Sequence, residues 1–293
     1  MSPPHVVVVG DVAVDVLVEP STPAVRGADV PAQIRFAAGG AGANTAAWLA
    51  HLRAEVTLVG RVGDDAAGRT AAADLRAAAV RPVLAVDTDL PTCTVVVLLE
   101  AGERTMLSDR GAAARLVPAD LPPFHGADHL HLSGYVLLDP SSRPAGLAAL
   151  AAARTAGLTT SVDPQAAPRL TEEFREWVGG VDLLLPNADE LAALGGSATD
   201  LLDVVGAVAV TDGPRGARWI DRRGTWQVPA PAAEVVDATG AGDAFDAGLL
   251  AAWLSGAGPA EALRAGCAAG TAAVRAVGGK APLHKGEGEG TDR

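Results

Sequence analysis

Short runs rich in β-branched residues alternate with alanine-rich segments along most of this chain. The runs stand at residues 6–9, 56–59, 130–132, 159–162, 183–185 and 208–211, and segments with a helical pattern stand between them at 68–79, 144–156 and 188–194. Strands that alternate with helices predict a parallel sheet covered by helices on both faces. Ligands of such sheets bind at the carboxyl ends of the strands, so functional residues are expected there.

Two segments interrupt this alternation. Residues 12–18, continuing to about residue 36, have the pattern of a strand followed by turn residues. Residues 92–107 have the pattern of a β-hairpin with its turn at Ala101-Gly102. Both segments therefore predict β-structure outside the alternating part of the chain.

The composition fits one large α/β domain, or a core with a small appendage, and it limits the partners. Of the 293 residues 49% are apolar but only 3% are aromatic, so Ala, Val and Leu must form the core. The net charge of −12 argues against nucleic acid and anionic membranes as partners. No apolar run is long enough to cross a bilayer.

A cytoplasmic location is expected from the N-terminus and the cysteines. The N-terminus lacks a basic region followed by a long apolar segment, so no signal peptide is predicted. Cys93 and Cys267 are the only cysteines, and they form no CxxC pair. Two such thiols in a chain of this size fit a reducing compartment.

The segment 237–243, Asp-Ala-Thr-Gly-Ala-Gly-Asp, places a glycine-rich turn directly before Asp243 and a long apolar helical run. Because the turn opens a helix, free N–H groups and the positive end of the helix dipole converge on one point. The backbone amides of Gly240, Ala241 and Gly242 are predicted to hold a phosphoryl group there. Asp243 is predicted to accept the proton of an attacking hydroxyl group. The alternative is that Asp243 only complements the helix dipole as a first-turn carboxylate.

Two other nucleotide-binding patterns are missing from the sequence. Lys280 and Lys285 are the only lysines and the pattern GxxxxGK[ST] is absent, which excludes a Walker-type P-loop. The first predicted strand is followed by Gly10-Asp-Val-Ala-Val instead of GxGxxG. This difference argues against a dinucleotide-dependent oxidoreductase.

A second glycine-rich turn precedes an alanine-rich helical segment at residues 39–52, Gly-Gly-Ala-Gly-Ala-Asn-Thr-Ala-Ala-Trp-Leu-Ala-His-Leu. Asp15, after the first predicted strand, and Asn44 offer a pair of acceptors and a mixed donor and acceptor, which suit sugar hydroxyls. Gly39 and Gly40 are expected to let the backbone lie close to a sugar ring.

These two glycine clusters, in this order, resemble the two sequence motifs of the ribokinase-like (PfkB-type) carbohydrate kinases. The resemblance spans essentially the whole chain. Further family landmarks are matched in order by Gly60-Arg-Val-Gly-Asp64 with Gly68, Leu132-Ser-Gly-Tyr135, Val162-Asp-Pro164, Pro186-Asn-Ala-Asp-Glu190 and Val210-Thr-Asp-Gly-Pro-Arg-Gly216. One such match would be expected by chance, whereas a collinear set of this length is highly specific.

The resemblance implies a three-layer αβα domain with a mostly parallel central sheet and a small β-sheet lid over the sugar site. The main domain would comprise residues 1–11, 37–91 and 108–284, and the lid residues 12–36 and 92–107. Such a lid would exclude water and so prevent wasteful ATP hydrolysis. The lid strands are apolar on both faces, so a homodimer through the lids is expected. The polar, glycine-rich tail 285–293 is expected to be disordered.

The resemblance also implies ATP as phosphoryl donor and Mg²⁺ as its metal ion. Asn187 and Glu190, at a predicted strand end, would organise Mg²⁺ and phosphate, mostly through water. The alternative is an ordinary helix start in which these two residues form a capping box. Thr211, Gly213 and Gly216 would line the phosphates and ribose of ATP, and the alternative for them is a tight turn between two strands.

Two further pairs of residues receive roles from the resemblance. Asp237 and Thr239 are expected to help hold a monovalent cation such as K⁺, with backbone carbonyls completing the site. Arg104 and Arg110, on or just after the predicted hairpin, are candidates for reaching substrate or phosphate when the lid closes. The alternative for both arginines is an ordinary surface position.

The substrate-binding positions depart from those of true ribokinases. Where ribokinases carry Asn, Lys and a sugar-binding Glu, this chain has Ala13, Ala41 and Tyr135. A site that loses these polar groups should not hold ribose in the same way, while Tyr135 could stack on a ring, donate a hydrogen bond, or be a core aromatic. The predicted function is ATP-dependent phosphorylation of a primary hydroxyl of a small sugar or sugar acid. The alternatives are an adenosine kinase-like nucleoside kinase and, less favoured, a non-catalytic nucleotide-binding protein.

Overall fold

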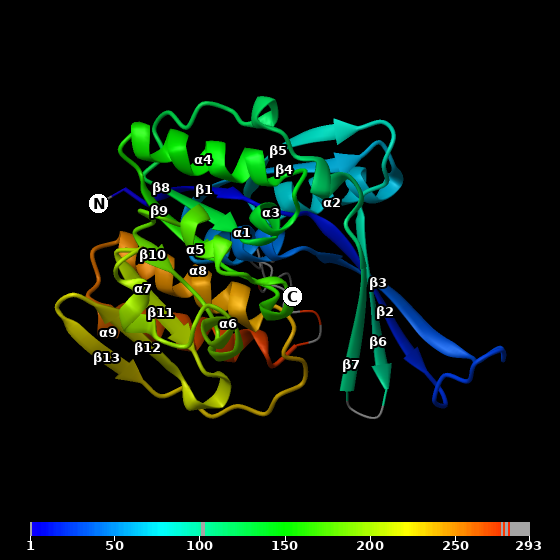
Figure 1. The fold of residues 1–293 in the computed structure, drawn as a ribbon. Coiled ribbons are helices and arrows are strands. Elements are labelled where there is room, and N and C mark those ends of the chain that lie inside the picture. Colours follow the sequence, from blue (N-terminus) through cyan, green and yellow to red (C-terminus); the bar gives the residue numbers. More distant parts are fainter. Residues whose placement is uncertain (1, 101–102, 277, 279–280, 282–293) are drawn as a thin grey trace, which may run out of the picture.

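The computed structural model describes residues 2–100, 103–276, 278 and 281 and arranges them around two β-sheets (Figure 1). In this part of the chain the main sheet has nine strands, in the order β13-β12-β11-β10-β9-β8-β1-β4-β5. They are β1 (His5–Val9), β4 (Glu55–Gly63), β5 (Val80–Asp87), β8 (His129–Ser133), β9 (Thr159–Asp163), β10 (Leu183–Leu184), β11 (Ala207–Thr211), β12 (Ala217–Asp221) and β13 (Gly224–Val228). The strands from β11 to β5 pair in parallel, and β12 and β13 add an antiparallel edge.

The six strands predicted from β-branched runs are all present in this sheet, and the mostly parallel sheet is confirmed. Strands β5 and β13 were not expected, because neither has an uninterrupted β-branched run. They form the two opposite edges of the sheet. An edge strand tolerates a proline such as Pro82 in β5, because the missing backbone N–H is not needed to pair with a further strand.

Helices cover both faces of the main sheet, which confirms the three-layer arrangement. One face carries α1 (Ala41–His51), α2 (Ala66–Ala77), α8 (Ala241–Leu254) and α9 (Pro259–Ala273), whose buried residues form one core cluster. The other face carries α3 (Tyr135–Leu138), α4 (Arg143–Thr155), α5 (Glu173–Trp177), α6 (Ala188–Ala193) and α7 (Ala198–Leu201), whose buried residues form a second cluster. In Figure 1, α4 lies on one side of the central strands β8 and β1, and α1 and α8 lie on the other.

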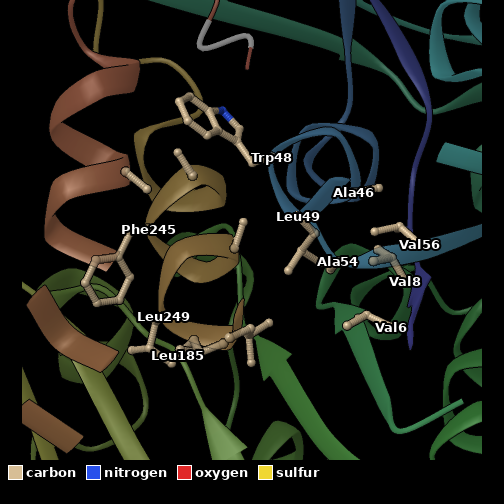
Figure 2. Close-up of a cluster of buried hydrophobic side chains, with 14 of the residues drawn as sticks. Val6, Val8, Ala46, Trp48, Leu49, Ala54, Val56, Leu185, Phe245 and Leu249 are labelled. Atoms are coloured by element: carbon tan, nitrogen blue, oxygen red, sulfur yellow. The ribbon is translucent and has the colours of Figure 1, made fainter. Parts of the chain in front are cut away.

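Strand β1 lies between the two cores because both of its faces are apolar. Val6 and Val8 belong to the cluster beneath α1 and α8, while Val7 and Val9 belong to the opposite cluster, as the alternation of side chains along a strand requires. Figure 2 shows Val6 and Val8 on the side of Leu49 of α1. Small and medium-sized apolar residues fill these layers, as the low aromatic content predicts.

A smaller sheet stands away from the main sheet (Figure 1). Its strand order is β3-β2-β6-β7, with β2 (Ala13–Pro20), β3 (Ala32–Gly39), β6 (Cys93–Glu100) and β7 (Glu103–Asp109). The predicted hairpin is confirmed as the antiparallel pair β6 and β7, and its turn at Ala101-Gly102 lies outside the described residues. The residue limits of the main domain and lid stay predictions, and the tail 285–293 also lies outside the described residues.

In the described part of the chain, no helix combines the length and the apolar character needed to cross a membrane.

Candidate active site

Two chain segments 199 residues apart meet at the carboxyl edge of the main sheet. Asn44 lies in the first turns of α1, and Asp243 lies in the first turn of α8. Nδ2 of Asn44 donates a hydrogen bond to Oδ2 of Asp243 at 2.9 Å. The two glycine-rich turns of the sequence therefore open two helices whose N-terminal ends share one site, as expected beside the carboxyl ends of parallel strands.

Asp243 is a buried carboxyl group, with 8% of the residue exposed. Burial disfavours the charged form and raises the pKa of Asp243 to about 7. Hydrogen bonds from Asn44 and Gln165 lower this pKa, and the charges of Asp11 and Asp15 raise it. A carboxyl group that ionises near neutrality is well matched to taking a proton from a hydroxyl group.

The N-terminal end of α8 is shaped for an anion. Gly240 is the N-cap, with φ 69°, a left-handed conformation that favours glycine. The first bond inside the helix runs from Ala244 N–H to Gly240 C=O, so the preceding amides face out of the helix end. The Ala241 amide donates to the Ala238 carbonyl over 3.3 Å, whereas a Cβ on Gly242 would meet nothing within 4 Å. The space beside Gly242 is therefore open to a ligand, whereas the Ala241 amide already has an acceptor.

The glycines beside Asp15 are required by the packing of the protein itself. Asp15 lies on β2 and is 7% exposed, and a Cβ on Gly39 would come within 2.1 Å of its Oδ1. Gly40, the N-cap of α1, has φ 96°, and its Cβ would lie 2.6 Å from the Asp11 carbonyl. These glycines hold the carboxylates of the site close to α1. Contact of Asp15, Gly39 and Gly40 with a sugar ring stays a prediction.

Tyr135 opens α3 directly after β8, and Arg110 covers one face of its ring. The guanidinium carbon of Arg110 lies 4.6 Å from the ring centroid. Nη1 of Arg110 donates to Asp11 at 3.1 Å, and Nε donates to Asp139 at 3.0 Å. Burial raises the pKa of Tyr135 to about 12, so the phenol stays protonated at neutral pH. Stacking of Tyr135 on a substrate is therefore limited to the other face of its ring.

Arg110 does not occupy the ordinary surface position that was its alternative interpretation. Its side chain is 17% exposed and lies between two carboxylates. Burial works against its charge, but the pKa of Arg110 is raised because Asp11 and Asp139 outweigh that effect. Arg110 therefore ties the end of β7 to the main sheet. The side chain of Arg104 lies outside the described residues.

Asn187 and Glu190, predicted to lie near the nucleotide, form the capping box that was the alternative interpretation. Oδ1 of Asn187 accepts from the Glu190 amide, and Oε2 of Glu190 accepts from the Asn187 amide, each at 2.9 Å. Thr211, at the end of β11, forms a parallel bridge with Asn187, so the structure brings these three residues together.

This arrangement fits Mg²⁺ only in a largely hydrated form. The cap uses Oε2 of Glu190, so Oε1 can accept a hydrogen bond from a metal-bound water. Within the described ranges, no three His, Cys, Asp or Glu side chains gather as a metal-binding group. Mg²⁺ usually keeps several water ligands, so Asn187 and Glu190 fit this ion only through water.

The remaining nucleotide-site candidates lie in two loops. The predicted tight turn between β11 and β12 is present, with φ 53° at Gly213 and 98° at Gly216. A Cβ on Gly216 would lie 2.0 Å from the Val228 carbonyl, whereas one on Gly213 would meet nothing within 4 Å. Gly216 therefore serves the turn itself, while Gly213 leaves space in which a ligand can lie.

Asp237 and Thr239 close the loop that leads into α8. Oδ1 of Asp237 accepts from the amide and the hydroxyl of Thr239, at 2.8 and 2.7 Å, and Oδ2 accepts from the Gly278 amide at 2.9 Å. These hydrogen bonds give Asp237 and Thr239 a loop-closing role. Their part in holding a monovalent cation such as K⁺ stays a prediction.

Sequence reasoning missed a second pair of acids behind Asp243. Asp163 ends β9, and Asp246 lies one helical turn after Asp243; they are 9% and 2% exposed. The two carboxyl groups lie close enough to affect each other's pKa, and burial raises the pKa of both well above the ordinary value. The available signal was a second acid spaced i, i+3 on an otherwise apolar helix. Gln165, which contacts both Asp163 and Asp243, had no signal because its contacts depend on a loop conformation.

Comparisons with known proteins place this chain in a family. A profile of the family described as pfkB family carbohydrate kinase matches residues 3–286. An ATP-dependent ribose-1-phosphate kinase of Halopiger xanaduensis is 35% identical over 233 residues, which cover 75% of this chain and 75% of that protein. A fructokinase of Klebsiella pneumoniae is 34% identical over 267 residues, which cover 83% of this chain and 82% of that protein.

A solved structure extends the similarity to the fold. Aminoimidazole riboside kinase of Salmonella enterica, complexed with aminoimidazole riboside and an ATP analogue, has a TM-score of 0.80 and 30% sequence identity to this chain. The alignment covers 95% of this chain and 96% of that one, so it includes both sheets.

Proposed function

This chain belongs to the PfkB family of carbohydrate kinases, and from that premise we propose that it transfers the terminal phosphoryl group of ATP to a primary hydroxyl of a small sugar. At the level of the family, it is an ATP-dependent sugar or nucleoside kinase. The observation that carries the finer proposal is the buried Asp243 carboxyl in the first turn of α8, held by Asn44 from the other glycine motif.

The proposed reaction is a direct transfer with Asp243 as general base. The carboxylate takes the proton of the substrate hydroxyl while that oxygen attacks the terminal phosphorus of ATP. The new O–P bond forms as the bond to the bridging oxygen of ADP breaks, and ADP leaves with the electron pair. Amides at the N-terminal end of α8, with Gly242 foremost, stabilise the charge on the transferred group.

Asn187 and Glu190 are the proposed residues around a hydrated Mg²⁺. When bound, this ion neutralises charge on the phosphates of ATP. Glu190 contributes a fixed acceptor for its water ligands, because the capping box holds both side chains in place. Thr211 and Gly213 are proposed to lie along the nucleotide beside them.

Charge around the substrate position favours a neutral sugar over a sugar acid. Asp11, Asp15 and Asp243 all lie near the shared site. The neighbouring guanidinium of Arg110 is already paired with two carboxylates. A carboxylate or phosphate on the substrate would add to this negative charge, and among the donors of Arg110 only Nη2 lacks a partner within the described residues.

A nucleoside is the second candidate substrate. The Salmonella structure supports it, since that relative is complexed with aminoimidazole riboside. The position of Arg110 over Tyr135 weakens it, since one face of the aromatic ring is unavailable to a nucleobase. Thermal stabilisation by adenosine or aminoimidazole riboside, but not by fructose, would favour the nucleoside.

The proposal is tested by measuring ATP turnover with Mg²⁺ and one candidate substrate at a time. The candidates are fructose, ribose, ribose 1-phosphate, gluconate, adenosine and aminoimidazole riboside. We expect one neutral compound to be phosphorylated and Asp243→Asn to lose at least about 100-fold in kcat, as general-base catalysis contributes about 10²–10⁴-fold. Turnover of the variant at the wild-type rate would overturn the assignment of Asp243. Turnover of nucleosides alone would replace the sugar by a nucleoside.

The exposed face of the small sheet supports a homodimer through the lids. Ile34 and Phe36 of β3 and Leu107 of β7 are 57%, 75% and 60% exposed. The strand register places them on one face, together with Val16 of β2. A second copy of this chain carries the same apolar face, and two such faces can bury each other around a twofold axis. The mass in solution by light scattering tests this proposal.

A further inference from the structure

The loop after β9 has an unusual backbone directly behind the proposed base. Gln165 and Ala166 have φ angles of 60° and 40°. Residues other than glycine adopt this left-handed conformation at a cost of about 1 kcal/mol or more each. Two consecutive examples indicate that the surrounding structure holds the loop in place, and such segments concentrate at functional sites.

The surrounding contacts that hold the loop are specific. The Gly134 amide donates to the Asp163 carbonyl at 2.8 Å. A Cβ on Gly134 would come within 2.1 Å of the Pro164 carbonyl, so the start of α3 packs directly against this loop. The Gln165 amide donates to Oδ1 of Asp163 at 3.1 Å. These backbone contacts fix the direction in which the Gln165 side chain leaves the loop.

The carboxamide of Gln165 lies beside two carboxyl groups. Its Nε2 donates to Oδ2 of Asp163, and the same side chain lies near enough to Asp243 to lower the pKa of that carboxyl group. Nε2 is the only donor of a glutamine side chain and carries two hydrogens, so the nitrogen that donates to Asp163 is also the group that favours ionised Asp243. Asn44 donates to Asp243 from the opposite motif, so carboxamides from two elements lie beside this carboxyl group.

Asp246 anchors the far end of this arrangement. It lies next to Asp163, and its buried Oδ2 has no hydrogen-bond partner in the described part of the chain. A proton on Asp246, which its burial favours, lets it donate to Asp163. Asp243 and Asp246 are a helical turn apart, so α8 and the loop after β9 are joined at two points.

We infer that Gln165 is a positioning residue for the reaction: its carboxamide, held by Asp163 and by the left-handed loop, orients the Asp243 carboxylate toward the acceptor hydroxyl. This inference rests on the proposed role of Asp243 as the base. Gln165 needs no contact with ATP for this role, so it should affect turnover without affecting nucleotide binding.

Gln165→Met and Gln165→Glu test the inference. Methionine keeps the approximate shape but removes the donor, and glutamate replaces the donor by an acceptor. We expect each to lower kcat by about 10-fold or more, with KM for ATP within about twofold of wild type. Gln227→Glu, on an exposed position of β13, is the matched control and should leave kcat unchanged. Equal kcat in wild type and both Gln165 variants would overturn the inference.

The pH dependence separates positioning from a merely structural role. Loss of a donor disfavours ionised Asp243, so the acid limb of kcat/KM should move to higher pH, further for Gln165→Glu than for Gln165→Met. The charged and titratable groups that also face Asp243 are Asp11, Asp15, Asp163, Asp246 and Tyr135, and all are unchanged in these variants. Carbon-13 NMR of labelled aspartate, assigned with Asp243→Asn, measures the same shift without any substrate. Superimposable titrations in wild type and variants would overturn the inference.

A further variant guards against misfolding. Asparagine accepts the left-handed conformation better than glutamine, but its shorter side chain cannot span the two acids. Gln165→Asn should therefore melt at or above the wild-type temperature and still lose kcat. Wild-type turnover by Asp243→Asn would overturn Asp243 as the base and this inference with it, whereas an inactive Asp243→Asn beside fully active Gln165 variants would overturn only this inference.

Discussion

At the scale of single residues, the site is a balance between burial and hydrogen bonding at one carboxyl group. Burial raises the pKa of Asp243 to about 7, against the opposing effect of donors from Asn44 and Gln165. An ordinary exposed aspartate would be fully ionised at neutral pH but a weaker base. The environment thus makes Asp243 a stronger base at a cost in folding stability.

The stability cost gives a prediction for Asp243→Asn. The folded pKa of about 7 exceeds the ordinary value of 3.8, so between these values the folded protein binds more protons than the unfolded chain. The free energy of unfolding therefore falls as pH rises through this window, by about 1.4 kcal/mol per unit at most. Asp243→Asn has no carboxyl group at this position and does not lose this stability as pH rises. The Tm of the variant minus the Tm of wild type should therefore be larger at pH 8 than at pH 5.5.

Thermal melting at the two pH values measures this difference. The exposed Asp203→Asn serves as control and should show no such dependence. A gain in Tm that is equal at both pH values would mean that Asp243 titrates in its ordinary range.

At the scale of elements, helix starts and strand ends carry the site. Helix α6 begins with a capping box whose two side chains are also the proposed Mg²⁺ neighbours. A sequence pattern cannot choose between a cap and a metal site, because the same residue types serve both. The geometry shows the cap, and it remains compatible with a water-mediated ion.

Glu190→Gln separates the two roles. Glutamine preserves the capping box but removes the negative charge that attracts a hydrated cation. We expect an unchanged or higher Tm, because a buried charge is removed, and a several-fold higher Mg²⁺ concentration for half-maximal turnover. An unchanged Mg²⁺ requirement in a Mg²⁺ titration would leave Glu190 with the cap alone.

Arg110 links the small sheet to the main sheet at the end of β7. Removing one member of a buried ion-pair network leaves the others uncompensated, at about 3–5 kcal/mol. Arg110→Met should therefore lose stability in this range, and Arg110→Lys should recover only part of it, since an ammonium lacks the fork that bridges Asp11 and Asp139.

Urea unfolding of these variants tests the link. Arg69, paired with Asp64 at 68% and 64% exposure, provides the control Arg69→Met, for which about 0–1 kcal/mol is expected. If Arg110→Met costs no more than this control, the buried network does not fix the small sheet.

At the scale of the whole molecule, the two sheets carry different parts of the site. The main sheet and its helices position Asn44, Asp243 and Asn187, while the smaller sheet carries Asp15 and an exposed apolar face. In Figure 1 this sheet projects from the body of the protein, so its outer face is free to meet another copy.

The proposed dimer predicts a specific change in mass. Phe36→Lys places a charge in the exposed apolar face, where burial of an unpaired charge is unfavourable. We expect wild type at micromolar concentration to have twice the mass of one chain by light scattering, and the variant to have the mass of one chain. Val25→Lys, also exposed but outside the strands, is the control. A monomeric wild type would reject the dimer.

Much of the fold and part of the site followed from the order of residues alone. The strand and helix pattern determined the three-layer arrangement, because apolar runs of the right length can be buried only in a sheet covered on both faces. The glycine turn before Asp243 pointed to the start of α8, because left-handed backbone and free amides are local properties.

Other features depend on contacts between residues distant in the sequence, and only the tertiary structure decided them. The pKa of Asp243 depends on burial and on neighbours as far away as Asn44. The stacking of Arg110 on Tyr135 and the left-handed Gln165 arise because two sheets and a loop are packed together. No local sequence pattern specifies such contacts, because the partners interact only after folding has brought them within a few ångströms of each other.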